Sequence, residues 1–227
     1  AIMAKEHSGP VKTFSIGYEH PSDQSFSELD SARWLANHFK TVHSETILRP
    51  DAVTLIRKVV EGMGEPFADS SAIPTYLVSE VARQTVTVAL SGIGGDELFG
   101  GYPRYLGLRT AAQYQRVPRV LRERMAQWSS RLGERGNARD HAARLKRFLG
   151  DGHLPLPEQY RRWTTFIPAE WDGNLWGDHL EAVFVNDRSL GPAEVLFEQW
   201  PSSDPADRGM GVDLQSYLPD DLLRMAD

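Results

Sequence analysis

The sequence feature that most constrains the fold is the β-branched and apolar run Val86-Thr87-Val88-Ala89-Leu90, which leads directly into a glycine-rich loop, 91–102. Apolar runs without polar alternation are typical of strands that are buried on both faces of a parallel sheet. In open α/β sheets, ligands bind beyond the carboxyl ends of such strands. The run therefore predicts a buried strand at 86–90 and a ligand-binding loop immediately after it.

The chain before this run alternates between strand and helix signals. Short β-branched segments at 11–17 and 43–48 predict strands. Apolar residues at helical spacing predict helices at 28–39, after a capping Asp51, and at 75–83. Strand–helix–strand order, when repeated, is typical of a doubly wound parallel sheet, so the fold class we expect is α/β.

The second half of the chain changes character. From Tyr105 onward, arginine, leucine, alanine and glutamine dominate and strand signals are few. We therefore expect an α/β core over residues 1–104 and a helical part of the same domain over 105–227. A length of 227 residues suits one domain with its own core.

Composition excludes several classes of function. The formal net charge of −6 disfavours a general nucleic-acid surface, and the absence of cysteine rules out a disulfide, a cysteine zinc site or a cysteine nucleophile within these residues. The seven histidines show no metal-ligand spacing. No apolar run approaches the ~20 residues that span a bilayer, and the first residues lack the features of a signal peptide. We expect a cytoplasmic protein with neither nucleic acid nor membrane as a partner.

The glycine-rich loop has the composition of a phosphate site. Gly92, Gly94 and Gly95 would let the backbone turn sharply and approach a ligand closely. Asp96 follows them where a helix is expected to begin. An acid at that position commonly caps the helix, and it can alternatively hold a magnesium ion that is bound to phosphate oxygens. The loop alone leaves both roles open.

The whole string from Ser91 to Tyr102, Ser-Gly-Ile-Gly-Gly-Asp-Glu-Leu-Phe-Gly-Gly-Tyr, resembles a signature of the asparagine synthetase family. Three further segments resemble the family in the same order, at 13–17, 64–76 and 217–223. The resemblance implies a parallel sheet of the adenine-nucleotide alpha-hydrolase type, in which residues 1–104 form the nucleotide-binding core.

The resemblance also implies a reaction and a set of site residues. Family members use ATP and magnesium to adenylate the side chain of aspartate, and ammonia from glutamine then displaces AMP. By analogy, Ile16 and Gly17 would line the adenine pocket, and Ser91 and Gly92 would contact the nucleoside. Gly94 and Gly95 would bring the loop backbone to the phosphates. Asp96 would bind magnesium and, through it, the pyrophosphate, as the catalytic residue.

This sequence departs from the family pattern in three respects. The phosphate loop Ser-Gly-Gly-x-Asp-Ser, which in the family lies just before the position of Ala1, does not occur in the 227 residues. The family's N-terminal glutaminase domain is also missing. We therefore expect a fragment, truncated at both ends, that is inactive by itself. Ile93 stands where the family commonly has an acid that handles the incoming ammonia.

These departures leave alternatives open. One is a related adenylating, amide-forming enzyme that acts on another carboxylate, such as a β-lactam-synthetase-like paralogue. Another is a non-catalytic nucleotide-binding fragment. The oligomeric state is also open, and a homodimer is one arrangement that the sequence allows. For Ile16 and Gly17, a simple core strand and turn is nearly as well supported as an adenine wall. For Asp69, a turn is as well supported as substrate contact, and for Tyr102 we favour packing.

Overall fold

The computed structural model describes residues 2–18, 28–48, 52–65, 67, 69–131, 141–165 and 191–226. The chain divides into two compact units, Ala1–Ser91 with Met225–Asp227, and Gly92–Arg224. The division follows Ser91, whereas the sequence places the change of character at residue 104.

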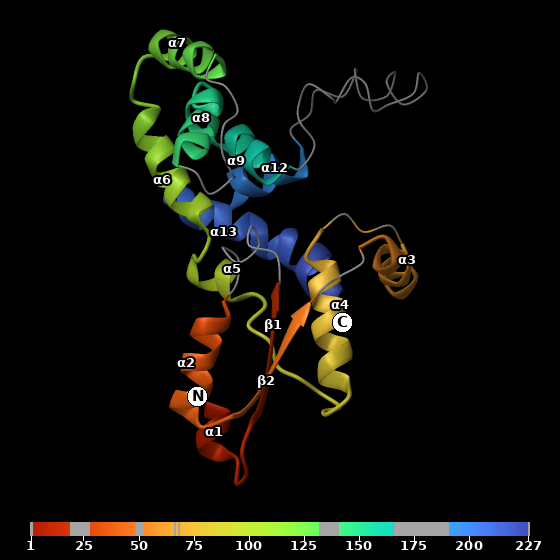
Figure 1. Cartoon of the computed structure of the whole chain (residues 1–227). Helices are drawn as coiled ribbons and strands as arrows, with labels where there is room; N and C mark the ends of the chain where they lie inside the picture. The colour runs from red at the N-terminus through yellow and green to blue at the C-terminus, as the bar shows by residue number, and fades with distance from the viewer. Residues whose placement is uncertain are drawn as a thin grey trace. The chain divides into compact units, whose positions relative to one another are not determined.

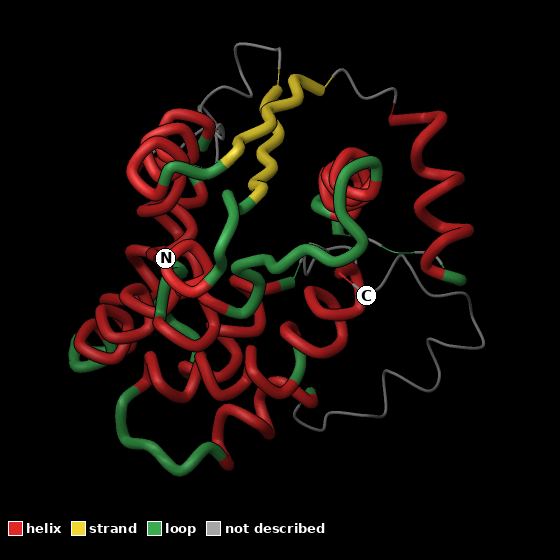
Figure 2. The backbone as a smooth tube through the Cα atoms, turned by 90° about the horizontal axis from the view of Figure 1, so that it is seen from below, coloured by secondary structure: helices red, strands yellow, loops and turns green. Residues whose placement is uncertain are grey.

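The first unit is built on a pair of parallel strands. Strand β1 spans Lys12–Tyr18 and β2 spans Val42–Leu48, with Lys12 opposite Val42 and Tyr18 opposite Leu48. Figure 2 shows the two strands, in yellow, running side by side. Both strands were predicted, and their parallel pairing confirms that part of the expected α/β class.

Four helices accompany the strands: α1 at Ile2–Glu6, α2 at Leu29–Phe39, α3 at Ala52–Met63 and α4 at Ala72–Arg83. Helix α2 connects β1 to β2, as a crossover between parallel strands requires. It buries Leu29 and Ala36. In Figure 1, α2 and α4 lie on opposite sides of the strand pair. Helix α4 begins three residues before the predicted start, and the predicted cap, Asp51, lies outside the described residues.

The strand predicted at 86–90 is not formed. No strand is assigned to these residues, and the side chains of Val88 and Leu90 are 79% and 83% exposed. The physical reason is the lack of a neighbour: within the described residues, β1 pairs with β2 and the sheet has two strands. An apolar run becomes a central strand only when other strands supply hydrogen bonds at its edges and helices cover its faces. The doubly wound sheet is therefore not confirmed.

The second unit is helical, as the sequence predicts for the chain after Tyr105. Its helices are α5 (Gly95–Phe99), α6 (Pro103–Tyr114), α7 (Arg119–Ser130), α8 (His141–Asp151), α9 (Leu156–Thr164), α12 (Pro192–Gln199) and α13 (Pro205–Gln215). A π-helical turn, η3 (Leu218–Leu222), and the short α14 (Leu223–Ala226) follow. None of the helices in the described ranges is long and apolar enough to cross a membrane.

The core of the second unit lies where four helices meet. Leu108 of α6, Tyr160 of α9, Phe197 of α12 and Val212 of α13 are each at most 2% exposed and pack together. Burying a large apolar side chain contributes about 1.5–3 kcal/mol. This cluster therefore fixes α13 against α6, and α6 follows directly from the glycine-rich loop.

Candidate functional site

The glycine-rich loop turns into a very short helix. Gly94 has a φ of +88° and is the N-cap of α5. A left-handed conformation at this position favours glycine. The Gly95 N–H donates a 3.0 Å hydrogen bond to the Gly92 carbonyl and closes the turn. Helix α5 has only five residues, so its helix dipole is small.

Asp96 is exposed in the first turn of α5 and does not cap it. The cap position belongs to Gly94, and no side chain makes a capping hydrogen bond there. The capping alternative for Asp96 is therefore wrong. A Cβ atom added at Gly101 would collide with Oδ1 of Asp96, and the Gly101 N–H donates a 3.0 Å hydrogen bond to the Asp96 carbonyl. The carboxylate thus lies directly against the Gly101 backbone.

At Gly92 and Gly95, the space where a side chain would begin is open in the described part of the chain. Gly92 is exposed and Gly95 half-buried, and a Cβ atom at either position would meet no atom within 4 Å. Ser91, the last residue of the first unit, is exposed as well. Internal packing of the described residues therefore gives no reason for glycine at positions 92 and 95. A ligand approaching the backbone would be such a reason.

The two residues proposed for the adenine pocket lie on β1, in the first unit. Ile16 is half-buried and lies opposite Thr46 of β2. Gly17 is buried, and a Cβ atom there would collide with the side chain of Leu29. Close packing of α2 on β1 therefore explains glycine at position 17. Of the predicted site residues, the structure groups Gly92, Gly94, Gly95 and Asp96, while Ile16 and Gly17 belong to the other unit.

The residue after Asp96 is a buried acid, Glu97. Glu97 is 1% exposed, and its carboxylate lies near the Tyr102 hydroxyl. Burial, together with this carboxylate, raises the pKa of Tyr102. The guanidinium carbon of Arg104 lies 3.9 Å from the Tyr102 ring centroid and 5.4 Å from that of Tyr217. Tyr102 therefore packs under the loop, as we favoured.

Arg104 connects the loop to a buried carboxylate on α13. Asp213 is 2% exposed, and its Oδ2 accepts hydrogen bonds from Arg104 Nη2 at 2.7 Å and from the Tyr105 hydroxyl at 2.5 Å. Its Oδ1 accepts a hydrogen bond from Tyr160. A buried charge is tolerated when it is paired and hydrogen-bonded. Asp213 meets that condition and joins α6, α9 and α13 at one point.

The electrostatics of this cluster favour one charge state. Burial raises the pKa of Tyr105 and Tyr160, and the Asp213 carboxylate raises both further. Burial alone would lower the pKa of Arg104, but the neighbouring carboxylate of Asp213 raises it above its ordinary value. All three donors to Asp213 therefore stay protonated. The cluster is a fixed support for the start of α6, and thus for the loop that precedes it.

Sequence reasoning missed Glu97, Arg104 and Asp213 as parts of this support. The signal that was present lies in α13, where Ala206, Gly209, Val212 and Asp213 recur at helical spacing and are all buried. An acid on an otherwise small and apolar helical face indicates a buried carboxylate that needs partners. The partners themselves come from distant helices, so the sequence alone does not identify them.

Asp69 forms a turn, as one of its two interpretations proposed. Its Oδ1 accepts hydrogen bonds from the backbone N–H and the hydroxyl of Ser71, at 2.7 and 2.6 Å, just before α4. A side chain that bonds the backbone two residues on is a local turn device. This geometry accounts for Asp69 without a substrate.

Asp96 suits a magnesium ion that is shared with phosphates. No three His, Asp or Glu side chains in the described part of the chain lie close enough together to hold a metal ion. Magnesium, however, usually keeps several waters and binds through one or two carboxylates together with substrate phosphates. A single exposed carboxylate on a loop with an open backbone fits that mode of binding.

Comparison with known proteins identifies the family. The sequence profile of the family described as asparagine synthase matches residues 1–227. The chain is 35% identical over 159 residues to asparagine synthetase [glutamine-hydrolyzing] 1 of Bacillus subtilis strain 168, an alignment that covers 70% of this chain and 24% of that protein. It is 31% identical over 229 residues to a putative asparagine synthetase [glutamine-hydrolyzing] of Mycobacterium tuberculosis H37Rv, covering 100% of this chain and 33% of the relative.

A third relative, putative asparagine synthetase [glutamine-hydrolyzing] 2 of Methanocaldococcus jannaschii, is 42% identical over 113 residues, which cover 49% of this chain and 21% of the relative. The chain thus spans at most a third of the length of these relatives. No solved structure matches it. The family match along the whole chain agrees with the loop signature, and the chain belongs to the asparagine synthase family.

Proposed function

We propose that the protein containing this chain uses ATP to adenylate the side-chain carboxylate of aspartate, and then forms asparagine with ammonia derived from glutamine. The observation that carries the proposal is the exposed Asp96 on its glycine-rich loop, held against Gly101 in a chain of the asparagine synthase family. The glutamine-hydrolysing names of the relatives support the nitrogen donor.

The proposed chemistry has two steps. An oxygen of the aspartate side chain attacks the α-phosphorus of ATP, and the bond from that phosphorus to the leaving pyrophosphate breaks. The nitrogen of ammonia then attacks the activated carbonyl carbon and loses a proton. The bond from that carbon to the phosphate oxygen breaks, and AMP leaves with the electron pair. In the first step an anion approaches a polyanion, so positive charge has to offset the repulsion. A magnesium ion supplies that charge when it is bound.

The residues of this chain would position the nucleotide. Asp96 would hold the magnesium ion through its exposed carboxylate. The open backbone at Gly92 and Gly95 would allow the phosphates to approach, and Ser91 would contact the nucleoside. Ile16 and Gly17 would lie near the adenine, with Gly17 contributing backbone because its Cα is packed under Leu29.

The proposal concerns a protein longer than these 227 residues. The phosphate loop of the family does not occur among them, and each charge-assisted hydrogen bond that such a loop supplies is worth ~1.5–3 kcal/mol. We therefore expect this chain alone to lack asparagine synthesis. We also propose that the full protein works in the cytoplasm, where ATP is available.

A second candidate function rests on Ile93. This residue lies in the turn between Gly92 and Gly94, where the family commonly has an acid. Isoleucine cannot accept a proton from an incoming amine. This difference favours a relative that adenylates another carboxylate and closes an amide with an amine already present in its substrate, as a β-lactam synthetase does.

The test is pyrophosphate release by the full-length protein, screened with aspartate, glutamate and carboxylates that carry an internal amine. The proposal expects release with aspartate, and asparagine when glutamine is added. Release with an amine-bearing carboxylate, but not with aspartate, would favour the second candidate. Release with none of them would contradict adenylation altogether.

A further inference from the structure

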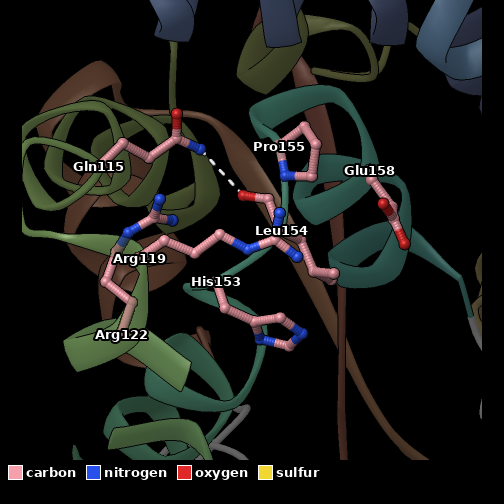
Figure 3. Close-up of a pocket in the computed structure, with 7 residues that line it drawn as sticks. All are labelled: Gln115, Arg119, Arg122, His153, Leu154, Pro155 and Glu158. Atoms are coloured by element: carbon pink, nitrogen blue, oxygen red, sulfur yellow. Dashed lines mark hydrogen bonds between the residues drawn. The ribbon is translucent and has the colours of Figure 1, made fainter. Parts of the chain in front are cut away.

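A pocket of about 490 Å³ lies in the second unit, away from the residues of the glycine-rich loop. It is formed by the residue that follows α6, the first turns of α7 and α9, and the segment that links α8 to α9 (Figure 3). Small-molecule pockets commonly enclose about 300–1,000 Å³. The volume is thus sufficient for a metabolite-sized ligand.

Hydrogen bonds connect the segments that form this pocket, so its shape does not depend on a ligand. Gln115 Nε2 donates a 2.9 Å hydrogen bond to the Leu154 carbonyl, drawn as the dashed line in Figure 3. Arg122 donates from Nε to the Val117 carbonyl at 3.0 Å and from Nη1 to the Gly152 carbonyl at 2.7 Å. Because these segments are already joined by hydrogen bonds, the pocket can bind a ligand without first ordering them.

The lining carries more positive than negative charge. Arg122 bonds to two backbone carbonyls, and no carboxylate pairs with it in the part of the chain that the structure describes. Arg119 is 74% exposed and uses Nε for Glu123 of its own helix, at 2.8 Å. His153 donates from Nδ1 to the Gly150 carbonyl, at 2.9 Å, so Nε2 of the neutral ring is an acceptor and not a donor. The acid in the lining, Glu158, lies 3.8 Å from Arg162.

Two helices also begin in this lining. Arg119 is the first residue of α7, and Pro155 is the N-cap of α9. The N-terminal end of a helix carries partial positive charge, which adds to that of the side chains. Leu154 and Pro155 contribute an apolar wall beside the cationic groups.

We propose that this pocket binds a small organic anion whose phosphate or carboxylate oxygens contact Arg119 and Arg122. Guanidinium groups favour such oxygens because their planar N–H donors match two oxygens at once. The inference is independent of the proposed synthesis, since no residue of the loop at 91–102 lines the pocket. It assigns the helical part of the chain a ligand of its own.

The test is calorimetric titration of the full 227-residue chain with inorganic phosphate and, separately, with malonate, at constant ionic strength. The variant is Arg119→Gln. The matched control is Arg124→Gln, an exposed arginine of the same helix that does not line the pocket. We expect one saturable site in the wild type and in the control. Arg119→Gln should weaken binding about tenfold or more, since a hydrogen bond to a charged group is worth ~1.5–3 kcal/mol.

The two probes distinguish the two sources of the anion. Binding of phosphate alone indicates a phosphorylated ligand, and binding of malonate alone indicates a carboxylate. Binding of neither probe would overturn the proposal. So would binding that Arg119→Gln leaves unchanged, because the anion would then lie elsewhere, for example on the loop at 91–102. Circular dichroism of each variant confirms that it is folded.

Discussion

Oδ1 of Asp96 lies so close to the Cα of Gly101 that a Cβ atom there would collide with it. The two residues are also joined by the hydrogen bond from the Gly101 N–H to the Asp96 carbonyl, at 3.0 Å. The glycine thus sets the position of the carboxylate that we propose for magnesium. The Asp-Glu-Leu-Phe-Gly-Gly segment places this acid on one side of α5 and buries the next one, Glu97, on the other.

Gly101→Ala should therefore impair the proposed site without removing any ligand. The added methyl group forces the Asp96 side chain or the loop backbone to move, because a collision with a neighbouring atom has to be relieved. We expect ATP–pyrophosphate exchange by the full-length protein to fall, and to recover in part at high magnesium concentration. Gly62→Ala, in α3 and outside the loop, is the control for added bulk, since a Cβ atom there meets open space. Equal exchange in wild type and Gly101→Ala would show that the contact is unimportant.

Asp213→Ala should destabilise the second unit strongly. Removing this carboxylate leaves the charge of Arg104 and the Tyr105 hydroxyl without their acceptor, while the Tyr160 hydroxyl keeps the Gly209 carbonyl at 3.1 Å. Breaking a buried ion pair typically costs about 3–5 kcal/mol. Urea unfolding, followed by tryptophan fluorescence, measures the change. Glu123→Gln, which removes an exposed ion pair on α7, should cost at most about 1 kcal/mol. Comparable small losses in both variants would mean that the cluster contributes little.

A third prediction concerns pH. Asp204 accepts a 2.9 Å hydrogen bond from the Ala206 N–H as the N-cap of α13, and Arg109 Nε lies 3.1 Å from its carboxylate. The hydrogen bond from Arg109 lowers the pKa of Asp204, and the bond from Ala206 lowers it further. The ionised form is thus favoured in the folded state. Its contribution to stability is complete above the unfolded pKa of about 3.9, and is lost as the pH falls through the lower folded pKa.

Asp204→Asn keeps a capping oxygen but cannot titrate. The difference in unfolding free energy between the wild type and this variant should be constant from about pH 7 to pH 5, and should shrink below about pH 4. Urea unfolding at a series of pH values measures this difference. A difference that persists unchanged to pH 3 would rule out the charge of Asp204 as its source.

Local patterns in the sequence predicted much of the fold. Strands β1 and β2 and helices α2 and α3 lie where β-branched runs and helical spacing place them, because those patterns reflect local burial. The run at 86–90 has the composition of a central strand, yet Val88 and Leu90 are exposed. A strand depends on neighbours at both edges, and no local pattern states whether those neighbours are present.

The candidate site, like the fold, was predicted only in part from the sequence. The signature from Ser91 to Tyr102 located the loop, and Gly94 has the left-handed backbone that its glycine suggests. The resemblance did not explain Glu97, whose carboxylate is buried against Tyr102. Nor did it reveal Asp213, more than a hundred residues from Arg104 and Tyr105. Contacts between distant helices depend on packing, which a linear pattern does not record.

The proposed synthesis requires that Asp96 holds the magnesium ion on which adenylation depends. Asp96→Asn in the full-length protein tests it directly, because asparagine preserves the size of the side chain and removes its charge. Since Asp96 does not cap α5, the melting temperature should not change. ATP–pyrophosphate exchange with aspartate should fall about hundredfold or more, because electrostatic stabilisation by a metal ion is worth several kcal/mol. Exchange close to that of the wild type, even at low magnesium concentration, would contradict the claim.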